Sequence, residues 1–244
     1  MKVAVQIAGL PRFSKEFDEF INSMQGYDQI DWFFYLWNDG KDQFVAPFWK
    51  SSTVDQMREK IANHLPANHN IAYLELHDCP EYTVTRPLNT TQWTNPPNVW
   101  YMHLGLKLVT EIREQYEAEH GKYDIVVKAR CDSTITPGID LKAAKLFFDQ
   151  HPRSILTSAN HRLGLMGRVV SEPIAFGTSE TISTVCKMFD HLFEYNDQGV
   201  LYHPETLTAH HLYVNNIDTP MTDFSFEFRK YKLPDGTPDW GHWN

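Results

Sequence analysis

The sequence has 244 residues, of which 42% are apolar and 14% aromatic, and its formal net charge is −9 at pH 7. A chain of this length and composition can fill the core of one large α/β domain or of two small ones. The negative charge and the lack of a Lys/Arg-rich run argue against a nucleic-acid partner, because binding to a phosphate backbone needs a basic surface.

Cysteine usage and the start of the chain indicate a cellular compartment. Three cysteines are widely spaced without a CxxC pair, at Cys79, Cys131 and Cys186. A disulfide framework or a structural zinc site is therefore not expected. We expect instead a protein of a reducing environment. The apolar start is too short for a signal peptide, and no segment reaches the ~20 apolar residues of a membrane span. We therefore expect a cytoplasmic protein without a membrane span.

The first half of the chain alternates predicted strands with predicted helices. Apolar residues spaced three and four apart predict helices over residues 14–24, 54–65 and 99–116. Short apolar runs predict strands over residues 2–8, 31–37, 70–76 and 123–131. The segment 80–97, rich in Thr, Asn and Pro, is expected to be a long surface loop. Continuous apolar strands separated by helices predict an α/β fold with a mainly parallel sheet covered on both faces.

The second half is less regular. Strands are expected over residues 154–159, 172–176 and 224–231. A helix with an N-cap hydroxyl is expected to begin at Thr178-Ser179-Glu180 and to place Ile182, Val185, Phe189 and Leu192 on one face. Pro204 predicts the first turn of another helix, since proline suits that position. With no repeat and no low-complexity linker, one domain is expected.

Polar segments follow three of the predicted strands. They are Gly9-Leu10-Pro11-Arg12, Trp37-Asn38-Asp39 and Arg130-Cys131-Asp132. In open α/β sheets, ligands bind at the carboxyl ends of the strands, so these segments are expected to form one site.

The charges of this site suit a diphosphate. Arg12, Lys128 and Arg130 would supply positive charge, and Asp132 would supply an oxygen ligand for Mg²⁺ or Mn²⁺. Metal and cations together would stabilise the charge on a departing phosphate group. The alternative is that Arg130 and Asp132, two residues apart, form only a surface ion pair worth about 0–1 kcal/mol.

Six segments occur in an order that resembles a family of glycosyltransferases of bacteria and their viruses, related to enzymes of lipopolysaccharide and capsule synthesis. The segments are VQIAGLPRF, DWFFYLWND, VWYMHLGLKLV, YDIVVKARCD, PIAFGTSETI and HPETLTAHHLYVNNI. The resemblance implies a single domain of GT-A type, with a nucleotide-binding half over residues 1–135 and an acceptor-side half over 136–244. It also implies a nucleoside-diphosphate sugar as donor and a glycan or other hydroxyl compound as acceptor.

The resemblance also implies roles for individual residues. Asp132 would stand where the DxD motif of metal-dependent enzymes stands and would hold the metal and the diphosphate. The remaining donor-site residues would be Gly9, Pro11 and Arg12 on the nucleotide, Trp37 and Asn38 beside its base or ribose, Lys128 and Arg130 near the phosphates, and Phe176 and Gly177 on the sugar or acceptor side. The chain departs from the motif at Arg130, which replaces the first aspartate, so its cation would substitute in part for the metal.

Candidates for proton transfer and for additional metal ligands lie in the second half. Glu205 is the first candidate for the general base that deprotonates the acceptor hydroxyl, with Glu172 in reserve. The competing explanation is that an acid in a first helical turn is favoured by the helix dipole alone, by about 0.3–1 kcal/mol. His210 or His211 could complete a metal site, although a histidine on a helix is more often packed or solvated.

Two other functions fit the same pattern. A sugar nucleotidyltransferase shares the order of elements but usually carries a glycine-rich phosphate loop, where AGLPRF has one glycine. A carbohydrate-binding protein that retained the fold and lost catalysis would explain the incomplete DxD motif.

Overall fold

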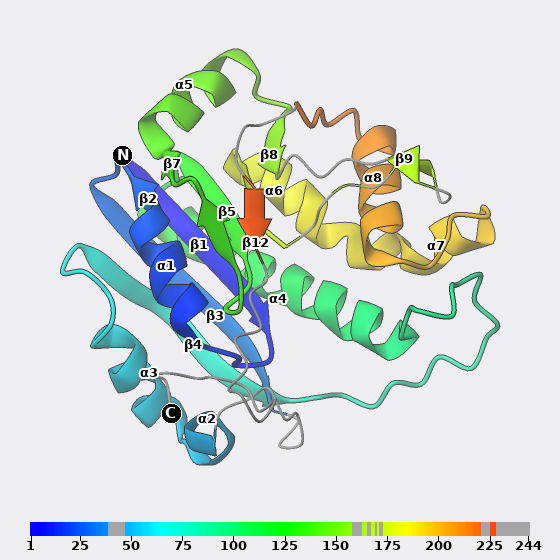
Figure 1. Ribbon diagram of the computed structural model, residues 1–244, viewed down its shortest axis with the longest axis horizontal. Helices are drawn as coiled ribbons and strands as arrows, with labels where there is room; N and C mark the ends of the chain where they lie inside the picture. Colours follow the sequence, from blue (N-terminus) through cyan, green and yellow to red (C-terminus); the bar gives the residue numbers. More distant parts are fainter. Residues whose placement is uncertain are drawn as a thin grey trace.

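The computed structural model describes residues 1–38, 47–157, 170 and 173–220, and the backbone of 163–164, 167–168 and 225–227. Its centre is a six-stranded sheet in the order β4-β3-β1-β5-β11-β8 (Figure 1). These strands are β4 (His69–Asp78), β3 (Gln29–Asn38), β1 (Lys2–Gly9), β5 (Ile125–Ala129), β11 (Ala175–Gly177) and β8 (Ile155–Thr157). The first four are parallel, and β11 is antiparallel to both of its neighbours. The expected α/β fold with a mainly parallel sheet is confirmed.

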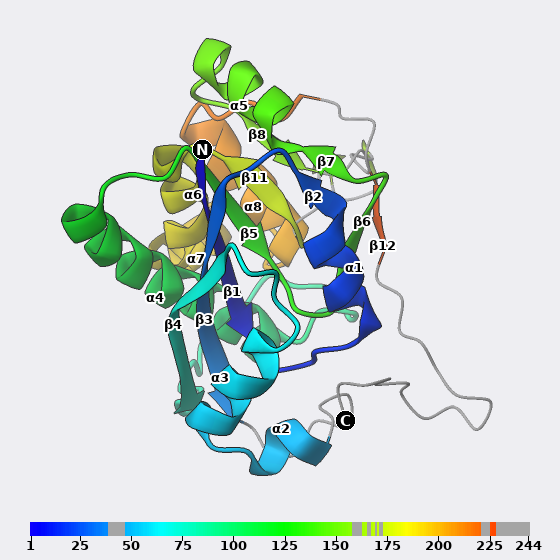
Figure 2. The ribbon, with the colours of Figure 1, turned by 90° about the vertical axis from the view of Figure 1, so that its left-hand side faces the viewer.

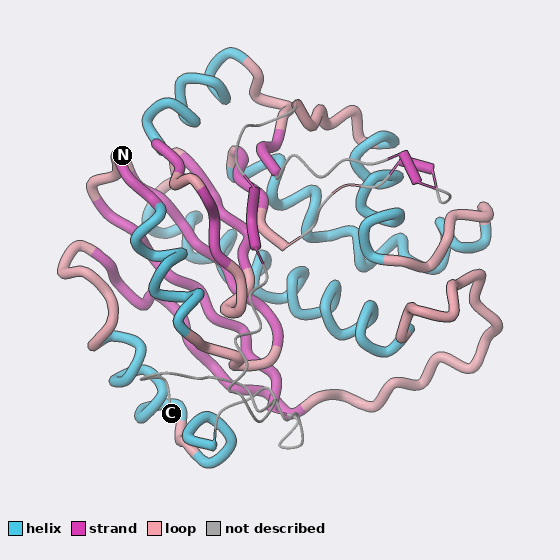
Figure 3. The backbone as a smooth tube through the Cα atoms, in the orientation of Figure 1, coloured by secondary structure: helices cyan, strands magenta, loops and turns pink. Residues whose placement is uncertain are grey.

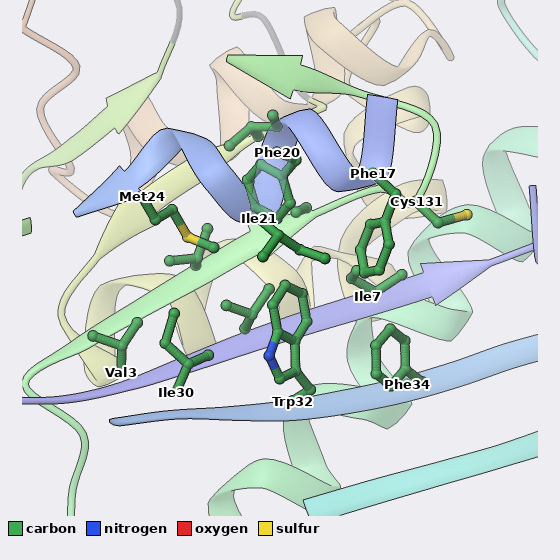
Figure 4. Close-up of a cluster of buried hydrophobic side chains, with 14 of the residues drawn as sticks. Val3, Ile7, Phe17, Phe20, Ile21, Met24, Ile30, Trp32, Phe34 and Cys131 are labelled. Carbon is green, nitrogen blue, oxygen red and sulfur yellow. The ribbon is translucent and has the colours of Figure 1, made fainter. Parts of the chain in front are cut away.

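One face of the sheet is covered by four helices, α1 (Lys15–Ser23), α2 (Pro47–Ser51), α3 (Val54–Ala62) and α5 (Leu141–Gln150). Helix α1 follows the predicted spacing, because Phe17, Phe20 and Ile21 are all buried against the sheet (Figure 4). On β3 the rings of Trp32 and Phe34 stack with centroids 5.7 Å apart and complete this core. Helix α1 ends at Ser23 because Met24 takes an extended conformation and enters β2.

The opposite face is covered by α4 (Pro96–His120) and α6 (Ser179–Cys186), with α8 (Pro204–Val214) packed beside α6. Figure 2 shows α4 and α1 on opposite sides of the sheet. A Cβ added to Gly105 of α4 would lie 3.1 Å from both the Ala8 Cβ and the Trp37 Nε1, so glycine permits close approach of the helix to the strand ends. The helix therefore passes directly over the carboxyl ends of β1 and β3.

A buried polar network joins α4 to the sheet and to α6. The Arg113 guanidinium donates to Gln6 Oε1 (3.0 Å), Glu117 Oε2 (3.0 Å) and Ser179 Oγ (2.7 Å), and both Arg113 and Glu117 are shielded from solvent. Every partner is charged or hydrogen-bonded, which is the condition under which a buried ion pair is tolerated. The network fixes the lateral position of α4 on the sheet.

The structure differs from the sequence-based expectations mainly in the second half. The helix expected from Ser179 to Leu192 stops at Cys186 and continues as the 3₁₀ helix η1 (Lys187–His191) and then α7 (Leu192–Asp197). Helix α5 was not predicted. The strand expected over 224–231 is described only as β12 (Ser225–Glu227), which pairs with β6 (Thr134–Thr136).

Two further small pairs join β2 (Met24–Gln25) to β7 (Ile139–Asp140) and β9 (Leu163–Gly164) to β10 (Gly167–Arg168). The expected long loop leads from β4 to α4 and is visible as the extended pink segment in Figure 3. It is attached to the α7–α8 region, because Asn196 Nδ2 donates to Asn89 O (3.0 Å) and Tyr202 N donates to the same oxygen (2.7 Å). None of the described helices combines the length and the apolar character needed to cross a membrane.

Candidate functional site

The candidate site lies at the carboxyl edge of the sheet, after β1 and β5. These strands pair in register up to Ile7 and Ala129, so the chain segments that follow them leave the sheet side by side. The Cys131 thiol donates to Leu10 O (3.1 Å) and links the two segments. Gly9 ends β1 with a φ of +129°, a conformation that L side chains rarely adopt, and so turns the chain toward Arg12.

Two arginines converge on one carboxylate at this edge. Arg130 donates through Nε to Asp132 Oδ1 and through its NH2 nitrogen to Oδ2, both at 2.8 Å, while the Arg12 NH1 nitrogen lies 3.9 Å from Oδ2. Burial acts to raise the pKa of Asp132, but the charge and hydrogen bonds of Arg130, with help from Arg12, outweigh it and lower the pKa. Asp132 is therefore ionised at neutral pH, and the three side chains together carry one net positive charge.

This donor set fits an anion better than Mg²⁺ or Mn²⁺. Both oxygens of Asp132 already accept hydrogen bonds from Arg130. In the described part of the chain, no three or more His, Cys, Asp or Glu side chains are grouped so as to hold a metal ion. Two guanidinium groups with a planar fork of donors are, in contrast, well suited to phosphate oxygens.

Sequence reasoning missed a second carboxylate at this edge, Glu16. It lies in the first turn of α1, which packs along β6, the strand that follows Asp132. The side chain is 1% exposed; Ser14 Oγ donates to its Oε2, and no described residue donates to its Oε1. Burial raises the pKa of Glu16 against the opposing hydrogen bond from Ser14, and the negative charges of Glu19 and, to a smaller extent, Asp132 add to the rise. The sequence feature that points to Glu16 is its position three residues after the GLPRF segment, which ends at Phe13.

The remaining expected donor-site residues of the first half differ in accessibility. Pro11 and Lys128 are buried, and the alternation along β5 places Lys128 on the face covered by α4. Trp37 is 3% exposed, and its Nε1 donates to Tyr101 O (3.2 Å), which makes it part of the core under α4. Asn38 is exposed at the end of β3 and donates through Nδ2 to Asp78 Oδ1 (3.3 Å). Asp39 lies outside the described residues.

Phe176 and Gly177 lie on β11, between β5 and the edge strand β8. Phe176 is fully buried in the core under α1. A Cβ on Gly177 would lie 2.6 Å from Thr181 Oγ1 and 3.2 Å from Ile155 Cγ2, so packing alone requires glycine there. Packing therefore accounts for both residues without a sugar or an acceptor.

Helix α8 carries the expected general base. Glu205 lies in its first turn, and its Oε2 is 2.9 Å from His203 Nδ1. The pair combines a carboxylate with an imidazole, both of which can accept a proton. Glu172, the reserve candidate, lies outside the described residues.

The two histidines proposed as metal ligands are engaged with their own surroundings. His211 is 3% exposed; its Nε2 donates to Thr184 O (2.8 Å) and its Nδ1 accepts from Tyr195 OH (2.8 Å). His210 packs edge-on against the Tyr195 ring, with centroids 4.6 Å apart. Because both nitrogens of His211 have partners on α6 and α7, its residue type is explained without a metal.

Comparison with known proteins adds no family assignment. No family model matches the sequence, and no curated protein matches it. The site is therefore interpreted from its geometry and from the motifs of the chain itself.

Proposed function

We propose that this protein is a glycosyltransferase with a fold of GT-A type, which moves a sugar from a nucleoside-diphosphate donor to a hydroxyl of a glycan or another acceptor. The observation that supports it best is the convergence of Arg12 and Arg130 on Asp132 at the carboxyl edge of β1 and β5. This edge is where ligands bind in open, mostly parallel sheets. The order of the six motifs along the chain supports the same proposal.

The proposed reaction assigns each charged group one task. The acceptor oxygen forms a bond to the anomeric carbon of the sugar, and the bond from that carbon to the diphosphate oxygen breaks. Arg12 and Arg130 stabilise the negative charge that develops on the leaving diphosphate. Asp132 holds the Arg130 guanidinium in place through two hydrogen bonds. Glu205 takes the proton of the acceptor hydroxyl. No step needs a metal ion, since the donor set suits an anion.

A second candidate is a carbohydrate-binding protein without turnover. It is favoured by the closed Arg130–Asp132 pair, in which each oxygen of the carboxylate already has a partner. Partly exposed pairs of this kind also form for structural reasons and contribute little to stability. Such a protein would bind glycans but would not bind nucleoside diphosphates.

Thermal denaturation in the presence of UDP, GDP, CDP or ADP, each with and without Mn²⁺, separates the two. A ligand that binds only the folded protein adds about 2.7 kcal/mol of stability at one hundred times its dissociation constant. We expect one of the four to raise the melting temperature without Mn²⁺, and Arg130→Gln to abolish the rise. Arg153→Gln is the matched control, because Arg153 is exposed and donates to Asn216 O at 3.2 Å, near the end of α8. No shift with any diphosphate would contradict the proposal.

A further inference from the structure

The long segment between β4 and α4 holds the side chain of Trp93 in solvent. Trp93 is 84% exposed, the largest exposed fraction among the large apolar residues that the structure describes. Contact between apolar surface and water is unfavourable, and tryptophan has the largest such surface of any side chain. An indole in this position is therefore a surface on which an apolar group of a ligand can be buried.

The backbone on both sides of Trp93 is fixed. Trp93 N donates to Thr91 Oγ1 (3.3 Å), the hydroxyl oxygens of Thr91 and Thr94 are hydrogen-bonded at 2.9 Å, and Thr94 N donates to Thr91 O (3.2 Å). Two prolines, Pro96 and Pro97, then begin α4, and their rings restrict the backbone further. Because the chain is already ordered there, a ligand that binds to the indole pays little conformational entropy.

The same segment is attached beside the turn that carries the proposed general base. Tyr202 N donates to Asn89 O (2.7 Å), and Thr90 Oγ1 donates to Tyr202 O (3.2 Å). Trp93 lies three residues after Thr90, which is about 11 Å of chain at most. Glu205 lies the same number of residues after Tyr202, in the first turn of α8. A glycan of a few sugar rings therefore spans the distance from the indole to the carboxylate.

The residues around the indole indicate the chemistry of its ligand. No Asp, Glu, Lys or Arg occurs between Arg86 and Lys107, and every residue from 89 to 95 other than Trp93 carries an amide or a hydroxyl group. Gln92 and Asn95, which flank Trp93, are exposed. Amide groups both donate and accept hydrogen bonds, as sugar hydroxyls do, whereas an anionic partner would find no cation in this stretch. One face of a pyranose ring presents mainly C–H groups and can cover an aromatic ring.

We propose that Trp93 stacks on a sugar ring of a neutral acceptor glycan, whose hydroxyl groups bond to Gln92 and Asn95. This inference rests on the proposed function, since the glycan is the acceptor that Glu205 deprotonates there. It goes beyond that function by naming residues that bind the acceptor and by restricting the acceptor to an uncharged carbohydrate.

Isothermal titration calorimetry with neutral linear tetrasaccharides tests the inference. The probes are tetrasaccharides of α-linked glucose, β-linked glucose, mannose and N-acetylglucosamine. We expect the wild-type protein to bind at least one of them, and Trp93→Ala to weaken that binding roughly tenfold or more, the effect of covering one face of an indole. Trp93→Phe retains an aromatic face and should bind with an affinity between the two. The affinity should not depend on salt concentration, since no charge takes part.

The matched control is Tyr213→Ala, which removes another exposed aromatic side chain, 73% exposed, near the other end of α8. It should bind the tetrasaccharide as the wild type does, and Trp93→Ala should keep the thermal shift with the diphosphate. Equal affinities of Trp93→Ala and wild type, or a wild type that binds none of the tetrasaccharides, would overturn the role of Trp93 while the proposed function stands. Trp93-dependent binding by a protein that no diphosphate stabilises would overturn the proposed function and the acceptor role together, and would favour the carbohydrate-binding protein.

Discussion

His211 makes the stability of this protein depend on pH in a way that follows from its contacts. The neutral ring donates through Nε2 to Thr184 O and accepts through Nδ1 from Tyr195 OH. A second proton would have to enter at Nδ1, which could then no longer accept from Tyr195 OH. Burial lowers the pKa of His211 from 6.5 to about 4, and the nearby His191 and His210 add to the lowering although the bond to Thr184 opposes it.

The direction in which stability changes with pH follows from proton binding to His211. Between pH 6.5 and pH 4 the unfolded chain binds a proton at this histidine and the folded chain does not, so stability is complete above pH 6.5 and falls as the pH decreases. Between pH 7.5 and pH 5 the expected loss is about 2 kcal/mol from His211 alone, using 1.36 kcal/mol per pKa unit. The pKa of His69, also lowered by burial to about 4, adds a loss in the same direction.

Urea denaturation at pH 7.5, 6.0 and 5.0 measures this loss for the wild type and for His211→Gln. Glutamine retains one donor and one acceptor but cannot take up a proton in this range. We expect the variant to be less stable than the wild type at pH 7.5 and to lose about 2 kcal/mol less on going to pH 5. Parallel pH profiles for the two proteins would refute the reasoning, and a chemical shift titration of His211 near pH 6.5 in the folded protein would do so independently.

Two further substitutions test the packing that supports the site. Arg113→Ala should lower the free energy of unfolding by about 3–5 kcal/mol, because it leaves the carboxylate of Glu117 buried without its main partner. If urea denaturation shows a smaller loss of unfolding free energy than an exposed Arg→Ala control does, this prediction is contradicted. Gly177→Ala should cost about 1–3 kcal/mol, since its Cβ would lie 2.6 Å from Thr181 Oγ1. If the substitution instead abolished nucleotide binding at unchanged stability, Gly177 would belong to the site and not to the core.

Local patterns predicted the elements that position the site. The apolar runs of β1, β3, β4 and β5 and the helical spacing of α1, α3 and α4 are properties of neighbouring residues, and the structure contains all of them. Because these strands are parallel, their ends had to meet at one edge, and the meeting of Arg12, Arg130 and Asp132 followed from that. Helix α5 carries a comparable signal, the N-cap Asp140 before Leu141, Ala144 and Phe148, although it is not among the predicted helices.

Burial and partners could not be predicted in the same way. The resemblance predicts Trp37 and Phe176 beside the donor or acceptor, and His211 is predicted as a candidate metal ligand, but each is enclosed by segments distant in sequence. By sequence Glu16 is an ordinary acid in a first helical turn. Only the packing of α1 beside the chain that follows β5 shows that one of its oxygens is buried and accepts no hydrogen bond from the part of the chain that the structure describes.

The sequence by itself thus determined the alternation of elements, the mainly parallel sheet and the edge that gathers the charges, since these depend on periodicity and on the geometry of parallel strands. Only the tertiary structure decided which of the polar side chains are accessible, which are paired and which are left with an unmet hydrogen bond. The physical reason is that solvent exclusion and hydrogen-bond satisfaction are set by contacts between residues far apart in the chain.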